Sequence, residues 1–339
     1  MDSRKCRFCN CPLNRVFIDL DESPLANSFL KESDFNTEKF YPLCTYLCEN
    51  CFLVQLEEQE TPENIFSNYA YFSSFSTTWL KHAQDFVEMI TKRLSLNNQS
   101  LVIEIASNDG YLLQNFIKKN IPVLGIEPAR NVAKAAMDNR IPTLVKFFNS
   151  KLAKKLTKDG TIADLIIGNN VLAHVPCLND FIDGLKILLK PSGVITLEFP
   201  HLLQLMKNNQ FDTIYHEHFS YFSFLTVINI FKHHELEIFH VQELSTHGGS
   251  LRLFVKHKSN DNFSITPEIK NILDKESKAG LDKIDTYTNF TISAEKIKED
   301  LLNFLHDCKK NNRQVIGYGA PAKGNTLLNF CNIDKTLIS

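Results

Sequence analysis

Several features of membrane and secreted proteins are missing from this 339-residue sequence. No run of about 18 apolar residues could form a transmembrane helix, and the N-terminal MDSRKCRFCN lacks the apolar core of a secretory signal. Neither sign of charge is in excess, since the formal net charge is −2. Internal repeats and low-complexity segments are also absent. We therefore expect a cytoplasmic, monomeric protein of two or three domains that binds neither nucleic acid nor a membrane.

Cysteine is present but unevenly placed, with six of the nine residues in the first 51. An odd count without a secretory signal argues against a disulfide framework. Two C-x-x-C pairs could instead place four thiolates on one tetrahedral zinc ion, which leaves no open position for water and so predicts a structural site. Cys11 and Cys44 are rival ligands without a C-x-x-C partner. The predicted ligands are Cys6, Cys9, Cys48 and Cys51.

Apolar strands and amphipathic helices alternate from residue 101 onwards. Short apolar strands of this kind predict a doubly wound α/β sheet that helices cover on both faces. Leu236–Gln242 and Ser250–Lys256 predict an antiparallel hairpin at the sheet edge. The other predicted strands are Leu101–Ala106, Val123–Ile126, Ala163–Gly168 and Gly193–Phe199, and the predicted helices are Tyr111–Lys119, Ala129–Asn139 and Leu178–Leu189.

Helical patterns flank this core on both sides. Residues 78–94 repeat apolar side chains at helical spacing before a polar loop at 97–100, which predicts a domain boundary. A second helical region is expected from Thr266 to about Lys310. Gln314–Gly319 then predicts a further strand, followed by a helix through residues 323–329. This is the first half of a βαβ unit, and the sequence ends where its second strand would begin.

The first core strand leads into a loop that lacks the glycines of a dinucleotide-binding fingerprint. An acidic residue, Glu127, follows this loop by about 20 residues, the position that binds a ribose in such folds. Because Ala106, Ser107 and Asn108 stand where a pyrophosphate requires glycine, S-adenosylmethionine (SAM), which has a ribose and no pyrophosphate, fits better. An ordinary βα turn with a capping Asn or Asp is the alternative. The candidate cofactor-binding residues are Glu104, Ser107, Asn108, Asp109, Gly110, Glu127, Pro128 and Asn169.

Polar residues also follow the predicted strand at 163–168. Asn169, Asn170 and His174 lie in an otherwise apolar stretch at the carboxyl edge of the sheet. Ligands bind at this edge in open α/β sheets, and buried polar side chains cost free energy unless they have partners. We therefore favour a pocket role for these residues over a core role.

A cluster of histidine, glutamate and tyrosine follows the next strand. Tyr215, His216, Glu217, His218 and Tyr221 lie within seven residues of one another. This composition suits proton transfer, because a neutral histidine with a pKa near ~6.5 is a good base at neutral pH. A tyrosine can donate a hydrogen bond to a developing oxyanion. The His-x-His pair could instead bind a metal, or the segment could be a polar surface turn.

Together these motifs resemble one family, the sugar C-methyltransferases of the mycarose and tetronitrose type. Members of that family methylate C-3 of nucleotide-linked 4-keto-deoxysugars. The resemblance covers essentially the whole chain, and its motifs follow the order of the family. It rests on the two C-x-x-C pairs and on residues 19–27, 69–76, 104–110, 125–128, 169–175, 211–221, 246–252 and 317–326.

The resemblance implies a chain of several functional parts. These are a zinc-binding domain (1–60), a helical connection with a substrate-closing segment (61–99), a class I, Rossmann-like SAM-dependent methyltransferase core (100–258) and a C-terminal helical and partial α/β domain (259–339). The sugar nucleotide is expected between the last two. Because family members continue well past the final helix, we expect an incomplete C-terminal domain here. An inactive paralogue that acts as a binding protein is the alternative.

The resemblance also implies roles for individual residues. His218 resembles the catalytic base of the family, with Tyr215 and Glu217 as supporting residues and His174 in the same pocket. The base would remove the C-3 proton next to the ketone, and the carbanion would attack the methyl group of SAM. A SAM-dependent methyltransferase with another small-molecule acceptor is a second alternative. The implied substrate-binding residues are Tyr69, Ser73, Ser76, Asn170 and Lys323.

Overall fold

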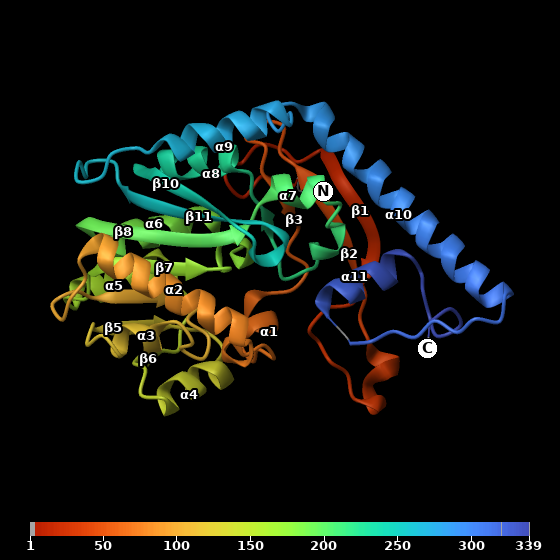
Figure 1. Ribbon diagram of the computed structural model, residues 1–339, viewed down its shortest axis with the longest axis horizontal. Coiled ribbons are helices and arrows are strands. Elements are labelled where there is room, and N and C mark those ends of the chain that lie inside the picture. Colours follow the sequence, from red (N-terminus) through yellow and green to blue (C-terminus); the bar gives the residue numbers. More distant parts are fainter. Residues whose placement is uncertain (1–3, 320, 339) are drawn as a thin grey trace.

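The computed structural model describes residues 4–319 and 321–338 and contains two sheets (Figure 1). The larger has seven strands in the order β10-β11-β8-β7-β4-β5-β6. Its strands are β4 (Val102–Ile105), β5 (Val123–Ile126), β6 (Thr143–Leu144), β7 (Ala163–Asn169), β8 (Leu189–Pro200), β10 (Leu236–Leu244) and β11 (Ser250–His257). The five strands from β4 to β8 are parallel, and the antiparallel hairpin predicted for the edge is confirmed.

Two layers of helices cover this sheet, as the sequence predicted. Apolar side chains of α2 (Thr77–Leu94), α3 (Leu113–Ile117) and α4 (Arg130–Asp138) pack with one face. Those of α5 (Ser150–Lys158), α6 (Leu178–Leu188) and α8 (Phe224–His233) pack with the other. The strand order reverses between β4 and β7, which is where doubly wound sheets open a ligand crevice.

The smaller sheet joins the N-terminal segment to the core. Its order is β1-β2-β3-β9, with β1 (Arg15–Ser23), β2 (Tyr41–Leu47) and β3 (Val54–Leu56) from the N-terminus. The fourth strand, β9 (Ser220–Tyr221), comes from the histidine-rich segment. It pairs antiparallel with β3, with Val54 opposite Tyr221 and Gln55 opposite Ser220. The sequence did not predict this pairing, because a two-residue strand has no visible periodicity.

The C-terminal region is helical in the residues that the structure describes. It holds α9 (Pro267–Lys278), the long α10 (Ile284–Lys310) and α11 (Ala322–Phe330). The strand expected at Gln314–Gly319 is wrong: this segment has no regular structure and pairs with no strand among the described residues. Instead α10 packs against β1, where Phe290 stacks on Phe17 at 4.9 Å. No helix in the described ranges is both long and apolar enough to span a membrane.

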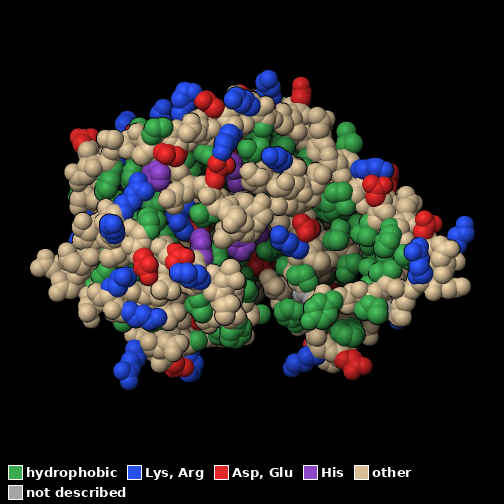
Figure 2. All heavy atoms as spheres, viewed as in Figure 1, with side chains coloured by type: hydrophobic (Ala, Val, Ile, Leu, Met, Phe, Trp, Pro, Cys, Tyr) green, Lys and Arg blue, Asp and Glu red, His purple; other side chains and the backbone are tan. Residues whose placement is uncertain are grey.

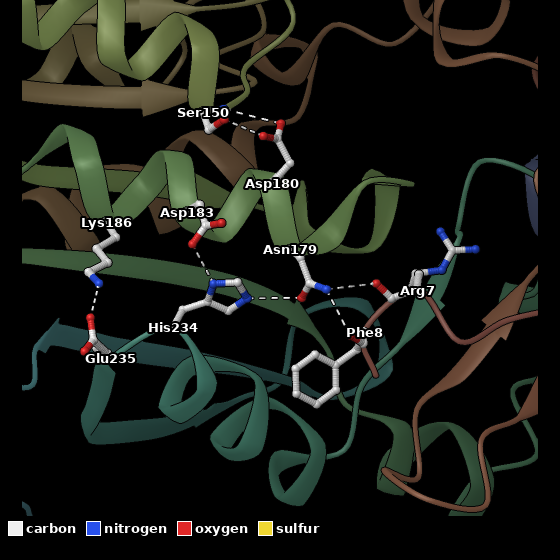
Figure 3. A network of polar contacts seen from close by, with 9 residues as sticks. All are labelled: Arg7, Phe8, Ser150, Asn179, Asp180, Asp183, Lys186, His234 and Glu235. Atoms are coloured by element: carbon white, nitrogen blue, oxygen red, sulfur yellow. Dashed lines mark hydrogen bonds and ion pairs between the residues drawn. The ribbon is translucent and has the colours of Figure 1, made fainter. Parts of the chain in front are cut away.

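A polar network fixes the first cysteine turn to the core (Figure 3). The side-chain amide of Asn179 on α6 donates to the backbone carbonyl of Phe8 at 2.9 Å. Its oxygen faces Nε2 of His234 at 3.1 Å, and Nδ1 of the same ring meets Asp183 at 2.7 Å. The N-terminal domain is therefore held to α6 as well as through β9.

Candidate functional site

The predicted zinc ligands converge on one point. The Sγ atoms of Cys6, Cys9, Cys48 and Cys51 all lie within 4.8 Å of one another. The separations Cys6–Cys51 and Cys9–Cys48 are 3.6 and 3.4 Å, near the ~3.8 Å expected between sulfurs of a tetrahedral site with Zn–S of about 2.3 Å. The cluster fits a zinc ion, and Cys11 and Cys44 lie outside it.

Two matching turns build this cluster. The amide of Asn10 donates to the carbonyl of Cys6 at 3.0 Å, and the amide of Phe52 donates to that of Cys48 at 2.9 Å. Both Asn10 and Phe52 have positive φ, 61° and 59°. Each turn therefore folds back over its own C-x-x-C pair and points two sulfurs at the same centre.

A single cavity of about 670 Å³ lies at the carboxyl ends of β4, β5 and β7. Residues of the candidate cofactor loop and of the candidate acceptor site share it, so a methyl donor and an acceptor could meet there. Figure 2 shows histidine side chains near the hollow at the centre of one face of the molecule. The lining includes Asn108, Glu127, Pro128, Asn169, Asn170, Tyr69, Ser73, His174, Tyr215, His218, His247 and Lys323.

Glu127 at the end of β5 is fixed by the backbone around it. Its carboxylate accepts hydrogen bonds from the amides of Asn108 at 2.9 Å and Ala129 at 2.8 Å. Burial raises the pKa of Glu127 to about 7, although these two bonds oppose the shift. The side chain lines the cavity, so its remaining lone pairs can accept the hydroxyls of a ribose.

Several buried polar atoms around the cofactor loop have no partner among the described residues. Both side-chain atoms of Asn169 are unpaired, and Asn169 lines the cavity. One oxygen each of Glu104, Ser107 and Asp109 is also unpaired, but these three residues are not among those that line the cavity. Buried groups of this kind are normally hydrogen-bonded, so the loop fits a polar ligand such as the methionine part of SAM. Gly110 has φ of 79°, a backbone conformation that favours glycine, and a Cβ at this position would collide with the side chain of Ile141.

The segment before α2 docks directly onto this loop. The backbone amide of Ser73 donates to Oδ1 of Asn108 at 2.9 Å, and that of Ser74 donates to Asp109 at 3.0 Å. Nδ2 of Asn108 in turn donates to the carbonyl of Tyr71 at 3.0 Å. Ser76 does not line the cavity; its hydroxyl caps α2 by accepting the amide of Trp79. Ser76 therefore positions the segment and does not face the cavity.

Glu217 connects two cavity residues. Its carboxylate accepts a hydrogen bond from Nδ2 of Asn27 at 2.5 Å and one from the hydroxyl of Tyr69 at 3.1 Å. Burial raises the pKa of Glu217, and both bonds oppose the shift. Asn27 was not singled out from the sequence, because it lies in the loop after β1 and far from the histidines in the chain.

One ring nitrogen of His218 is left without a proton by the contact that its other nitrogen makes. Its Nδ1 lies 2.9 Å from the carbonyl oxygen of Thr213, which can only accept, so Nδ1 carries the proton and Nε2 keeps its lone pair. Burial lowers the pKa of His218 well below its usual value, so the ring is neutral at neutral pH. Tyr215 and His174 flank it, with ring centroids at 4.1 and 4.8 Å.

The other histidines of the site differ in role. Burial lowers the pKa of His174 to about 4, and its ring lines the cavity. His216 points away, with Nε2 donating to the carbonyl of Pro42 at 3.2 Å, so His216 and His218 do not form a metal pair. His247, from the turn between β10 and β11, lines the cavity and was not among the predicted site residues. The two glycines that follow His247 in the sequence are the signal from which its place in the site could have been predicted.

The remaining acceptor-side candidates also lie on the cavity. Asn170 follows β7 with φ of 54°, and Lys323 comes from the first turn of α11. The positive charge of Lys323 acts to lower the pKa of both Asp212 and His218. The structure thus brings residues from the middle and the C-terminal end of the chain to one cavity.

The sequence matches known protein families along its length. The family described as "Methyltransferase domain" matches residues 79–241, and the "C-methyltransferase C-terminal domain" matches residues 245–339. A "zinc binding domain" family matches residues 6–66. The chain is 32% identical over 330 residues to "C-methyltransferase NovU" of Streptomyces niveus, a match that covers 97% of this chain and 78% of NovU.

Solved structures show similarity over about half of the chain. The PH0226 protein of Pyrococcus horikoshii OT3 is 15% identical with a TM-score of 0.45, covering 58% of this chain and 98% of that one. Magnesium protoporphyrin IX methyltransferase from Synechocystis PCC 6803 with bound SAM is 15% identical with a TM-score of 0.39, covering 52% and 80%. The family matches and the similarity to NovU, over a sheet of this order and a four-cysteine cluster, place the chain in the family of zinc-containing, SAM-dependent C-methyltransferases.

Proposed function

We propose that this protein methylates C-3 of a nucleotide-linked 4-keto-deoxysugar through an enolate. The observation that carries the proposal is the neutral His218, whose unprotonated Nε2 belongs to the same cavity as the candidate cofactor residues. Methylation of an oxygen or nitrogen needs no base that can deprotonate carbon. A carbon next to a ketone does need one, because its proton must leave before the methyl group arrives.

A residue of the cavity can be assigned to each step of the proposed chemistry. Nε2 of His218 takes the proton from C-3, and the electrons of the broken C–H bond form a double bond to C-4, which leaves negative charge on the ketone oxygen. Hydrogen-bond donors such as Tyr215 and His174 surround that position. SAM, when bound at Glu127 and Asn108, supplies an electrophilic methyl group. The closing segment around Ser73 excludes water from the reacting carbon.

The acceptor side fits an anionic sugar nucleotide. Lys323 contributes a positive charge to the cavity wall, and Asn170 and Tyr69 contribute neutral hydrogen-bonding groups. A phosphate-linked substrate is doubly attracted to such a site, by charge and by direct hydrogen bonds. The resemblance to the sugar C-methyltransferases supports the same class of acceptor.

Deuterium exchange tests the proposal directly. Wild-type protein, S-adenosylhomocysteine and a nucleotide-linked 4-keto-deoxysugar are incubated in D₂O, and NMR follows deuterium uptake at C-3. We expect uptake, with a loss on the order of 10²–10⁴-fold in His218→Asn, the usual share of a general base, and unchanged SAM affinity. Equal uptake in both proteins would exclude His218 as the base. A complete absence of exchange and product across a panel of such sugars would exclude the proposed substrate class.

A further inference from the structure

His247 is presented to the cavity by a tightly constrained turn. The residue has φ of 52°, and Gly248 and Gly249 follow with φ of 80° and 118°. A Cβ on Gly248 would lie 2.3 Å from the side chain of Gln210, and one on Gly249 would lie 2.6 Å from Gln204. Non-glycine residues at positive φ cost conformational energy, and such strain is concentrated at functional sites.

Asn170, which also has a left-handed backbone conformation, contacts His247. Asn170, with φ of 54°, places Nδ2 3.2 Å from Nε2 of the histidine. An amide nitrogen can only donate, so Nε2 accepts and the ring proton lies on Nδ1. Nδ1 has no hydrogen-bond partner among the described residues and is not enclosed by protein atoms. Both residues line the cavity, which leaves Nδ1–H as a donor for a bound molecule.

A series of packed side chains supports the ring of His247. Trp79 meets His247 edge-on at 5.4 Å and stacks on His82 at 4.9 Å. Nε2 of His82 contacts Glu198 at 2.9 Å, and Glu198 forms a buried ion pair with Arg252. A chain of contacts therefore runs from the middle of the sheet to His247.

The charge state of His247 suits a neutral donor. His247 is exposed at the opening of the cavity, yet the protein atoms around its ring still remove part of its hydration. This desolvation, together with the positive charge of Lys323, lowers the pKa of His247. At neutral pH the ring therefore carries one proton, on the nitrogen that Asn170 leaves free.

From this geometry we propose that His247 is a further catalytic residue, whose Nδ1–H donates to the ketone oxygen that becomes negative when His218 removes the neighbouring proton. The inference rests on the proposed enolate function. The base and the donor come from different elements, the segment before β9 and the β10–β11 turn. His218 can therefore contact the proton on carbon while His247 contacts the ketone oxygen of the same H–C–C=O unit. A donor placed for a developing oxyanion acts mainly in the transition state.

Two substitutions distinguish the loss of the hydrogen-bond donor from a distortion of the turn that carries it. Glycine and asparagine both tolerate positive φ, so His247→Gly and His247→Asn should both fold. The amide nitrogen of asparagine occupies nearly the position of Nδ1 in histidine, so only the glycine variant removes the donor. We expect His247→Gly to lower both kcat and C-3 deuterium exchange with S-adenosylhomocysteine on the order of 10²–10³-fold. We expect His247→Asn to retain most of the exchange.

The controls are SAM affinity and the KM for the sugar nucleotide. Both should change by less than about threefold in either variant if His247 acts on the transition state. A raised KM with normal exchange in His247→Gly, or an equal loss in both variants, would overturn the assignment. The test also separates this inference from the proposed function: if the wild type shows no exchange, the enolate mechanism itself fails and the role of His247 falls with it.

Discussion

The cavity has two halves, the candidate cofactor half and the proposed acceptor half, and they are built in different ways. The candidate cofactor half comes from βα units whose strands are neighbours in the sheet, and β4, β5 and β7 place Asn108, Glu127 and Asn169 side by side. The acceptor half gathers residues from separate regions, such as Asn27, Tyr69, His218 and Lys323. Local topology is sufficient for the first half, whereas the second depends on how the domains pack against one another.

The zinc-binding domain contributes to the acceptor half through Asn27 and also through strand β3. Gln55 on β3 accepts the amide of Arg7 at 2.9 Å and donates to Sγ of Cys6 at 3.3 Å. Its backbone pairs with Ser220 in β9, two residues after His218. In addition, the amide of Leu56 donates to the carbonyl of Phe219 at 3.0 Å. The β3–β9 strand pair thus connects the metal cluster to the segment that carries the candidate base.

Zinc removal should produce the largest difference between the two halves. In Cys48→Ser protein, β3 loses its support, and we expect C-3 exchange to fall by more than about 10³-fold, because structural zinc supplies folding free energy. SAM affinity, measured by calorimetry, should stay within about threefold, since the seven-stranded sheet is intact. Hydrogen exchange should rise at residues 218–221 but not at residues 102–105.

Cys44→Ser is the matched control, because Cys44 lies outside the four-cysteine cluster and does not line the cavity. It should keep zinc, exchange and SAM affinity. Unchanged protection at residues 218–221 in metal-free protein would show that the two sites are independent.

Replacement of Glu127 should affect the cofactor half alone. Glu127→Gln removes a charged acceptor, and we expect SAM binding to weaken by roughly 1.5–3 kcal/mol at pH 8. Because burial raises the pKa of Glu127 to about 7, the carboxyl is protonated below that pH. The wild-type affinity should therefore fall as pH drops from 8 to 6, by up to about tenfold per pH unit below 7.

Calorimetry at several pH values checks this prediction. Glu127→Gln should show no such pH dependence, because it has no titrating carboxyl. A wild-type affinity that is constant from pH 6 to 8 would mean that the bound ligand does not require the ionised form.

Gln55→Met should give the smallest effect. The change keeps volume but removes the contacts with Cys6 and Arg7, so β9 should become less ordered. We expect kcat to fall about three- to tenfold, as for one or two net hydrogen bonds, with SAM affinity unchanged. Gln84→Met on the exposed face of α2 is the control and should be neutral. An equal fall in SAM affinity would point to general destabilisation.

The sequence predicted the cofactor half more completely than the acceptor half. Glu127 and Asn108 follow strands with clear apolar patterns, so their proximity could be inferred from the order of the strands. The contact between Asn27 and Glu217 joins residues 190 positions apart, and no local pattern encodes it. Residues 314–319 show the opposite error, because strand-like composition does not supply a neighbouring strand.

The shared strand β9 also has a consequence for biosynthesis. A nascent chain is made from its N-terminus, so the cysteine pairs and β1 to β3 emerge long before Ser220 and Tyr221. Until then the edge of β3 that β9 later covers has no partner, and free strand edges invite pairing with other chains. Early binding of zinc would hold this edge in shape while the seven-stranded sheet is still being synthesised. The metal would then stabilise the edge of β3 during translation, before β9 has been synthesised.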